Sequence, residues 1–170
     1  SGKNVLGIAT SDAHRVSAAY TGYTLMIMPE NTVDNLKNCM SAGEFLAASK
    51  CIGNHEELQE IATYLIQNGD ADAAAIGQDI LDRQAEDYKA KYEAPLDVDA
   101  PEVNEIIVDD SADKISLDVD DDLCIRWISN GKTIAYGDEI DLDEHSGEIG
   151  SYIRAEIFGE GGIVYTQAML

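Results

Sequence analysis

The sequence predicts an α+β fold, and three observations carry this prediction. Residues 1–53 combine short apolar runs with one helical pattern, and residues 54–92 show helical periodicity throughout. Residues 104–170 instead alternate polar and apolar side chains with a period of two, in about seven short segments. A chain of 170 residues is long enough to bury a core of this mixed kind. We therefore expect a strand and helix piece, a helical hairpin and a C-terminal antiparallel, Ig-like β-sandwich.

The charge is distributed unevenly along the chain. Lys and Arg number 11 against 33 Asp and Glu, which gives a formal net charge of −22. Residues 1–50 hold four acidic and four basic side chains, so the whole excess of negative charge lies in residues 51–170. Basic residues that are so few and scattered argue against nucleic acid and anionic membranes as partners. The change in charge also places a domain boundary near residue 53.

The sequence shows no membrane or export signal. No segment approaches the roughly 20 apolar residues that span a bilayer, and the opening residues lack a basic and then apolar secretion pattern. The cysteines Cys39, Cys51 and Cys124 have no C-x-x-C spacing, which favours neither a disulfide framework nor a structural zinc site. These features predict a cytoplasmic location.

The first elements follow the pattern strand, loop, strand, helix. Residues 5–10 form an apolar run typical of a strand that is buried on both faces of a parallel sheet, and residues 23–28 form a second run. Apolar residues then recur at helical spacing between Asn31 and Gly43. We expect Asn31 or Thr32 to cap this helix and Gly43 to end it.

The helical pattern of residues 54–92 predicts a hairpin of two helices. The first helix begins at Asn54 and ends at Gly69, and the second runs from Asp70 to about Tyr92. Asn54 is followed three residues later by Glu57, which is a helix-capping arrangement. The G-N-H-E at residues 53–56 is similar to a metal motif of calcineurin-like phosphoesterases, but its companion motifs are absent in the required order, so we interpret it as a cap. Prolines in residues 93–103 predict an extended linker.

The alternating pattern of residues 104–170 predicts half-buried strands joined by tight turns. Asn130 and Gly131 together predict a two-residue hairpin turn, and the glycines of residues 159–162 predict another. Trp127 shares a strand face with apolar neighbours, which predicts a core anchor between two sheets rather than a sugar-stacking platform. We interpret Cys124 as a small packing residue. The acidic loops, including Asp118 with its neighbours, lack the Gly and Glu of a calcium loop and are expected to be solvated.

The local pattern with the most chemical content is Asp12-Ala13-His14, directly after the first apolar run. A carboxylate and an imidazole two residues apart in a loop can turn toward one metal ion, and this pair of ligands suits Zn, Mn or Fe. Two ligands are too few for a complete site, and an ordinary surface turn remains the alternative.

A longer series of motifs surrounds this pair. The residues G-I-A-T-S-D-A-H (7–14), G-Y-T (22–24) and S-A-G-E-F-L-A-A-S (41–49) occur in this order. The series resembles the last part of the polymerase and histidinol phosphatase family, which comprises metal-dependent phosphoesterases on a distorted β/α barrel. The resemblance implies that Asp12 and His14 are two ligands of a metal cluster that acts on a phosphate ester. It leaves Arg15 as a candidate contact to the substrate phosphate, with a plain surface role equally compatible.

The tail is similar to the small β domain at the C-terminus of some members, through Y-I-R-A-E (152–156) and G-G-I-V-Y (161–165). The other ligands of the family, including an H-x-H, lie upstream of these motifs, and His55 and His145 match no family position. The resemblance thus implies the C-terminal part of a longer enzyme: residues 1–53 from the barrel, 54–92 a helical hairpin, 93–103 a linker and 104–170 the β-sandwich. Such a chain would be inactive alone.

Two further expectations concern binding. Residues 1–50 would expose apolar surface that the rest of the barrel covers, so they are expected to self-associate or to pack on the helical hairpin. The alternative function is a non-catalytic, acidic β-sandwich at residues 104–170 that docks on a barrel or binds a partner.

Overall fold

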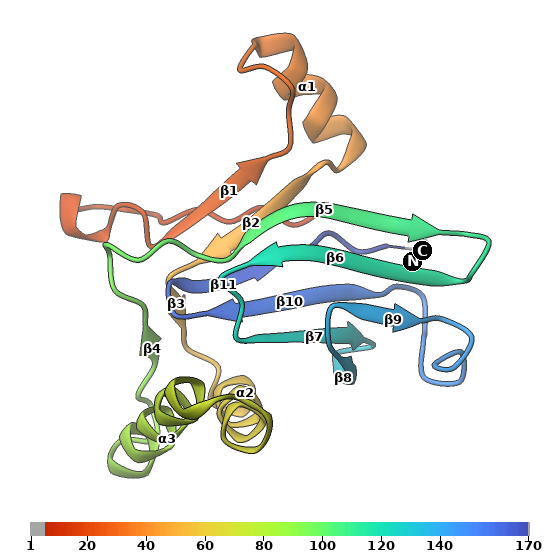
Figure 1. Cartoon of the computed structure of the whole chain (residues 1–170). Coiled ribbons are helices and arrows are strands. Elements are labelled where there is room, and N and C mark those ends of the chain that lie inside the picture. The colour runs from red at the N-terminus through yellow and green to blue at the C-terminus, as the bar shows by residue number, and fades with distance from the viewer. Residues whose placement is uncertain (1–5, 170) are drawn as a thin grey trace.

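The computed structural model of the chain describes residues 6–169. The helices are α1 (Val33–Ala42), α2 (His55–Asn68) and α3 (Ala71–Glu86), preceded by the short 3-10 helix η1 (Val16–Ala18). The strands are β1 (Gly22–Met26), β2 (Phe45–Ser49), β3 (Cys51–Ile52), β4 (Tyr92–Glu93), β5 (Glu102–Asp109), β6 (Lys114–Asp120), β7 (Cys124–Ser129), β8 (Lys132–Tyr136), β9 (Glu139–Asp141), β10 (Arg154–Gly159) and β11 (Gly162–Tyr165). Helix α1 stands at one end of the molecule and the α2–α3 hairpin at the other (Figure 1). The fold is therefore α+β.

The centre of the molecule is a six-stranded sheet in the order β1-β2-β11-β10-β7-β8. Side chains alternate between its two faces, as the pleat requires. One face packs against the three-stranded sheet β5-β6-β9 around a buried cluster that includes Trp127, Ile157 and Ile115. The other face packs against α2 and α3 through a second cluster. This cluster includes Phe158 and Ile163 of the sheet and Leu58 and Ile61 of α2. The result is three layers: sheet, sheet and helices.

The helix ends lie where their capping residues predict them. Thr32 caps α1, because its hydroxyl accepts a hydrogen bond from the Asn35 N–H at 3.2 Å, and Gly43 ends the helix in the left-handed region with φ +78°. Asn54 caps α2 by accepting from the N–H groups of Glu56 and Glu57. Capping side chains satisfy amide donors that have no partner inside the helix, which explains why these short signals are reliable.

The predicted turn and core anchor are also confirmed. Asn130 and Gly131 have φ +51° and +73°, the positive values that a two-residue hairpin turn between β7 and β8 requires. Trp127 is fully buried between the two sheets, and its indole N–H donates to the Gly137 carbonyl at 2.9 Å. Burial of Cys124 raises the pKa of its thiol to about 12, so this residue is protonated at neutral pH and serves packing.

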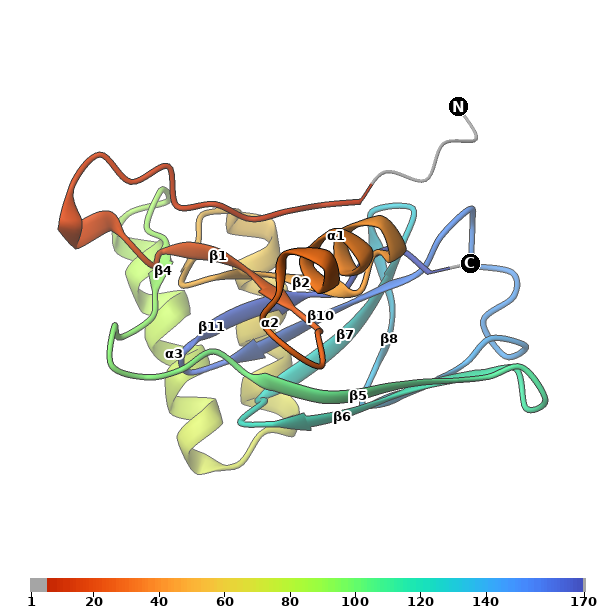
Figure 2. The same cartoon turned by 90° about the horizontal axis from the view of Figure 1, so that it is seen from above.

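The prediction for the first strand is wrong. Within residues 5–10, residue 5 lies outside the described part of the chain, and residues 6–10 form no strand. Side chains hold this segment instead: the Thr24 hydroxyl bonds both the N–H and the carbonyl of Ala9, and Gln167 bonds both backbone groups of Gly7. The segment runs along the side of β1 that faces away from β5 and β6 (Figure 2). It therefore has no backbone ladder and no parallel neighbour.

The sheet is antiparallel at every pairing among residues 6–169, so the expected parallel arrangement of the first strands is wrong as well. Strand β1 pairs with β2, and β2 pairs with β11 from the end of the chain. No barrel closes around these strands in the described residues. The boundary expected near residue 53 thus falls in a region where strands from both sides share one sheet.

Three smaller differences concern residues 86–129. Helix α3 ends at Glu86 rather than near Tyr92, and the chain then forms β4, which pairs with β3. The expected linker therefore begins and ends inside strands β4 and β5. All six residues of β7 are buried instead of half of them, because the hairpin covers the face that an isolated sandwich would expose.

No helix among residues 6–169 has the length and apolar character to cross a membrane.

Candidate functional site

The Asp12–His14 pair lies in an exposed loop between the extended segment 6–10 and η1. The His14 Nδ1 atom is 2.8 Å from the backbone carbonyl oxygen of Asp12. A carbonyl oxygen only accepts hydrogen bonds, so Nδ1 is the donor and carries the proton. The other ring nitrogen, Nε2, then has the free lone pair in the neutral ring. Metal-binding histidines are commonly oriented by a hydrogen bond of this kind.

The backbone of this loop is unusual at the same place. Asp12 has φ +44°, in the left-handed region that few residues other than Gly adopt, although Asp tolerates it better than most. Its side chain is exposed, as are those of His14 and Arg15. All three candidate residues are therefore close together in one loop and open to solvent. The loop can present a carboxylate and an imidazole nitrogen, but only this pair.

The remaining histidines do not complete a site. The ring of His55, at the start of α2, packs on Tyr88 with 4.1 Å between centroids, and His145 Nδ1 contacts Glu148 Oε2 at 3.1 Å. In the part of the chain that the structure describes, no three His, Cys, Asp or Glu side chains gather as a metal ion would require. Among the described residues, Asp12 and His14 are therefore candidate ligands without a third beside them.

A second cluster of charged side chains lies between α2 and the six-stranded sheet, where the sequence predicted no site. At its centre is Arg126 of β7, whose side chain is 5% exposed. Arg126 contacts Glu57 Oε1 at 2.9 Å and Glu60 Oε2 at 2.7 Å, both from α2, and it also pairs with Glu156 of β10. Arg154 pairs with the other oxygen of Glu156. We call these five residues the arginine cluster.

The electrostatics of the arginine cluster follow from its burial. Burial raises the pKa of Glu57, the nearby carboxylate of Glu156 raises it further, and Arg126 acts in the opposite direction. The Tyr165 hydroxyl lies 3.4 Å from Glu57 Oε1, and burial raises the pKa of this phenol as well. Buried charges are tolerated only when they are paired and hydrogen-bonded, and here the pairs join α2 to the sheet. The cluster is thus an anchor for the helical hairpin.

A polar cavity of about 470 Å³ opens beside the arginine cluster. Its lining includes Lys132 and Thr133 in addition to the clustered carboxylates and guanidinium groups. Charges of both signs line the cavity, and most of them already pair with one another within the arginine cluster. We assign it a structural role.

One signal in the sequence pointed to the arginine cluster. Glu57 and Glu60 are three residues apart, so they lie on one helix face, and Arg126 is the single charge in an otherwise uncharged strand. Sequence patterns alone do not show that the strand face bearing Arg126 is covered. We expected the face of β7 that bears Arg126 to be exposed to solvent, and the cluster was therefore not predicted.

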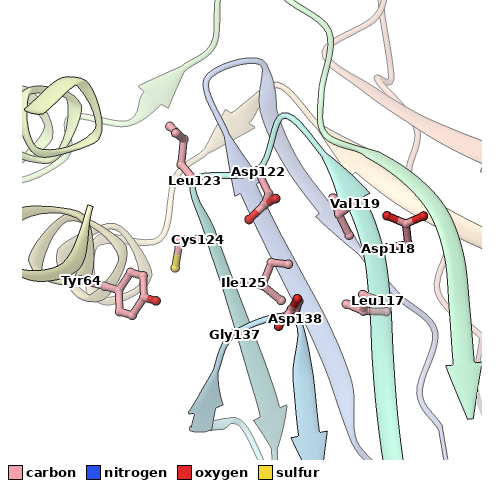
Figure 3. A pocket seen from close by; sticks show the side chains of 10 residues that line it. All are labelled: Tyr64, Leu117, Asp118, Val119, Asp122, Leu123, Cys124, Ile125, Gly137 and Asp138. Atoms are coloured by element: carbon pink, nitrogen blue, oxygen red, sulfur yellow. The ribbon is translucent and has the colours of Figure 1, made fainter. Parts of the chain in front are cut away.

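A small pocket of about 260 Å³ has three acidic residues in its lining: Asp118 from β6, Asp122 from the loop between β6 and β7, and Asp138 from the turn between β8 and β9 (Figure 3). The side chains of Asp122 and Asp138 both border the pocket, whereas Asp118 points away from it toward β5 (Figure 3). Burial raises the pKa of Asp122, and the nearby charge of Asp138 acts in the same direction. This pocket adds no third acidic ligand in the sense of a calcium loop.

An apolar groove of about 700 Å³ lies between β1 and the segment that leads into β5. Its apolar lining comes from Tyr23, Leu25, Ile27 and Leu46 on one side and from Leu96, Pro101 and Val103 on the other. Lys50 lies at its base with a buried side chain, which donates hydrogen bonds to the carbonyl oxygens of Pro95 and Val98. Asp99 and Glu102 also line the groove, so its surface is mainly apolar but carries two carboxylates beside the buried Lys50.

Comparisons with protein-family models, with the curated proteins and with the solved structures found no match.

Proposed function

We propose that this chain is the C-terminal part of a metal-dependent phosphoesterase, in which Asp12 and His14 are two of the metal ligands. The observation that carries the proposal is the orientation of His14, whose Nδ1–H is held by the Asp12 carbonyl so that Nε2 is available beside an exposed carboxylate. This geometry supports the role that the D-x-H motif and its neighbouring motifs imply. A divalent ion of the Zn, Mn or Fe type would supply activated water and neutralise phosphate charge.

Under this proposal residues 1–53 are the remnant of a distorted β/α barrel, and residues 104–170 form an Ig-like accessory domain. Large apolar side chains near the D-x-H loop are exposed, including Ile8 and Val16. The remaining part of the barrel would cover them and supply the missing ligands. Arg15, which is exposed directly after His14, is proposed to face the substrate phosphate.

The proposal is tested by titrating the chain with Zn²⁺ and following the NMR signals of its three imidazole rings. We expect weak binding that shifts the His14 ring first, because two ligands do not complete a tetrahedral site. The variant His14→Ala should weaken binding at least about tenfold, and Asp12→Asn should weaken it as well. High salt in the buffer suppresses the general attraction of cations to the acidic surface.

His145→Ala is the matched control, because that ring also lies near a carboxylate but in a different loop. Equal losses in His14→Ala and His145→Ala would contradict the assignment. In the full product of the gene, the double substitution at Asp12 and His14 should abolish the hydrolysis of phosphomonoesters or phosphodiesters with Mn²⁺ or Zn²⁺. A full product that retains its activity after this change, or one that never hydrolyses them, would exclude the proposed function.

A second candidate function is docking by a non-catalytic, acidic β domain. The apolar groove favours it, because a cleft of about 700 Å³ with exposed large side chains at its rim is typical of binding surfaces. In this form of the proposal the docking unit includes β1 and β2 as well as residues 104–169, since they share one sheet.

A further inference from the structure

The rim of the apolar groove concentrates exposed apolar side chains. Tyr20, Leu25, Ile27 and Leu96 line the groove and are 74%, 37%, 50% and 66% exposed. A neighbouring cavity of about 360 Å³ shares Ile27, Leu46 and Val103 with the groove and continues the apolar lining toward Ile106. The two cavities thus form one continuous apolar surface along β1 and the start of β5.

The edge of the sheet lies beside this surface. Strand β1 has β2 as its neighbour on one side and no strand on the other among residues 6–169. The backbone groups on the open side of such a strand can pair with another strand, and an apolar face beside them strengthens the contact. Pairing at this edge would extend the six-stranded sheet.

The charge of the chain restricts which partner can approach. Residues 1–50 are neutral in sum, whereas residues 51–170 carry the entire net charge of −22. Two copies that approach by the acidic part repel each other, and two copies that approach by the neutral part bring the acidic parts farthest apart. Strand β1 and most of the groove lining belong to the neutral part. Asp99 and Glu102 also line the groove, so a second copy meets these two carboxylates there but not the bulk of the negative charge.

From these observations we infer that a second copy of this chain covers the groove, with the two β1 strands antiparallel about a two-fold axis. Such an isologous contact is self-complementary, because the same open edge and the same apolar rim come from each copy. The inference rests on the docking function proposed above and does not depend on the metal site. Its failure would leave the outcome of the Zn²⁺ titration unchanged.

The test is sedimentation equilibrium of the full chain over a range of protein concentrations and NaCl concentrations. We expect a monomer–dimer equilibrium that becomes tighter as salt increases, since salt screens the repulsion between the acidic parts. An interface held by ion pairs would respond in the opposite sense. A chain that stays monomeric in high salt, or a dimer that weakens with salt, would overturn the inference.

Two matched variants locate the interface. Ile27→Glu places a charge on the groove rim and should weaken the dimer at least about tenfold, because a buried and unpaired carboxylate is strongly unfavourable. Ile107→Glu, on the exposed part of β5, changes a side chain of similar exposure outside the groove and should leave the dimer unchanged. Equal effects of the two substitutions would exclude the groove, and circular dichroism checks that both variants are folded.

Discussion

The N-terminal region (residues 6–43) and the three-layer core use similar apolar residues in opposite ways. Within the described chain, the exposed large apolar side chains of the N-terminal region are Ile8, Val16, Tyr20, Leu25, Ile27, Val33 and Met40. In the core, residues of the same kinds lie between the layers and are almost fully buried. An apolar run in the sequence therefore does not establish that a segment has a core to enter.

The helices show the same contrast. In α1 the single residue recorded as buried is Cys39, whereas α2 buries Leu58, Ile61, Ala62 and Leu65 against the sheet. Helix α2 is also joined to β7 by the arginine cluster. Both helices begin with a capping side chain, so the caps do not make α2 more stable than α1. We expect α2 to be the more stable helix, because tertiary burial provides most of the stability of helices of this length.

The largest expected effect is the loss of the core anchor. Trp127→Ala removes a fully buried indole and its hydrogen bond to Gly137, and it should lower the free energy of unfolding by about 3–5 kcal/mol. The matched change in the N-terminal region, Val16→Ala, should alter it by less than about 0.5 kcal/mol. Urea unfolding measures both values. Similar losses at the two positions would show that the N-terminal region has a buried core after all.

Breaking the arginine cluster should have the next largest effect. Arg126→Met removes the cation that pairs with carboxylates from α2 and β10, and the cost is about 3 kcal/mol because a buried charge is left poorly compensated. The double variant Arg126→Met/Glu156→Gln removes that charge too and should recover part of the loss. Urea unfolding of the two variants separates these contributions. A double variant that is less stable than Arg126→Met would show that the cluster is held together in another way.

The pH dependence of stability tests the burial of Glu57. Its pKa is raised in the folded state, so the folded protein binds more protons than the unfolded protein as the pH rises from the unfolded pKa to the folded pKa. The favourable contribution is complete below the unfolded pKa and is lost as the pH rises through the folded one. Glu57→Gln cannot lose this proton, so its stability should fall less than that of the wild type between pH 4 and pH 7.

Glu86→Gln is the control for this pH effect, since Glu86 is an exposed carboxylate at the end of α3. It removes one acidic group without touching the arginine cluster, and it therefore reports the general repulsion in a chain of net charge −22. Thermal unfolding across the pH range gives the slopes. If both variants flatten the profile equally, general repulsion rather than the burial of Glu57 is the cause.

Much of the fold could be predicted from the sequence because its signals are local. Caps at Thr32 and Asn54 and the turn at Asn130–Gly131 depend on side chains within a few residues. The pairing of β2 with β11 could not be predicted, since it joins residues more than 100 positions apart. The arginine cluster escaped for the same reason: Glu57 and Arg126 meet across layers.

The candidate metal site shows a different limit. The spacing of Asp12 and His14 predicted that both side chains share one loop, and the structure places them there. The spacing carried no information about the left-handed backbone of Asp12 or the hydrogen bond that orients the ring. It also leaves further ligands unspecified, because such ligands come from elements that are distant in sequence.

The smallest expected effects come from the helix caps, and they compare the two regions most directly. Asn54→Ala should lower the free energy of global unfolding by about 1 kcal/mol, because the cap belongs to a helix buried in the core. Thr32→Ala removes an equivalent cap from α1, but this helix can open without the core, so global unfolding should barely change.

Amide hydrogen exchange distinguishes these outcomes. Thr32→Ala should accelerate exchange in α1 by about fivefold, the equivalent of about 1 kcal/mol, while the strands of the core exchange as in the wild type. If Thr32→Ala instead accelerates exchange throughout the sheet, the N-terminal region unfolds together with the core. The exposed groove would then belong to the cooperative unit, and a second copy bound there would stabilise the whole chain rather than β1 and α1 alone.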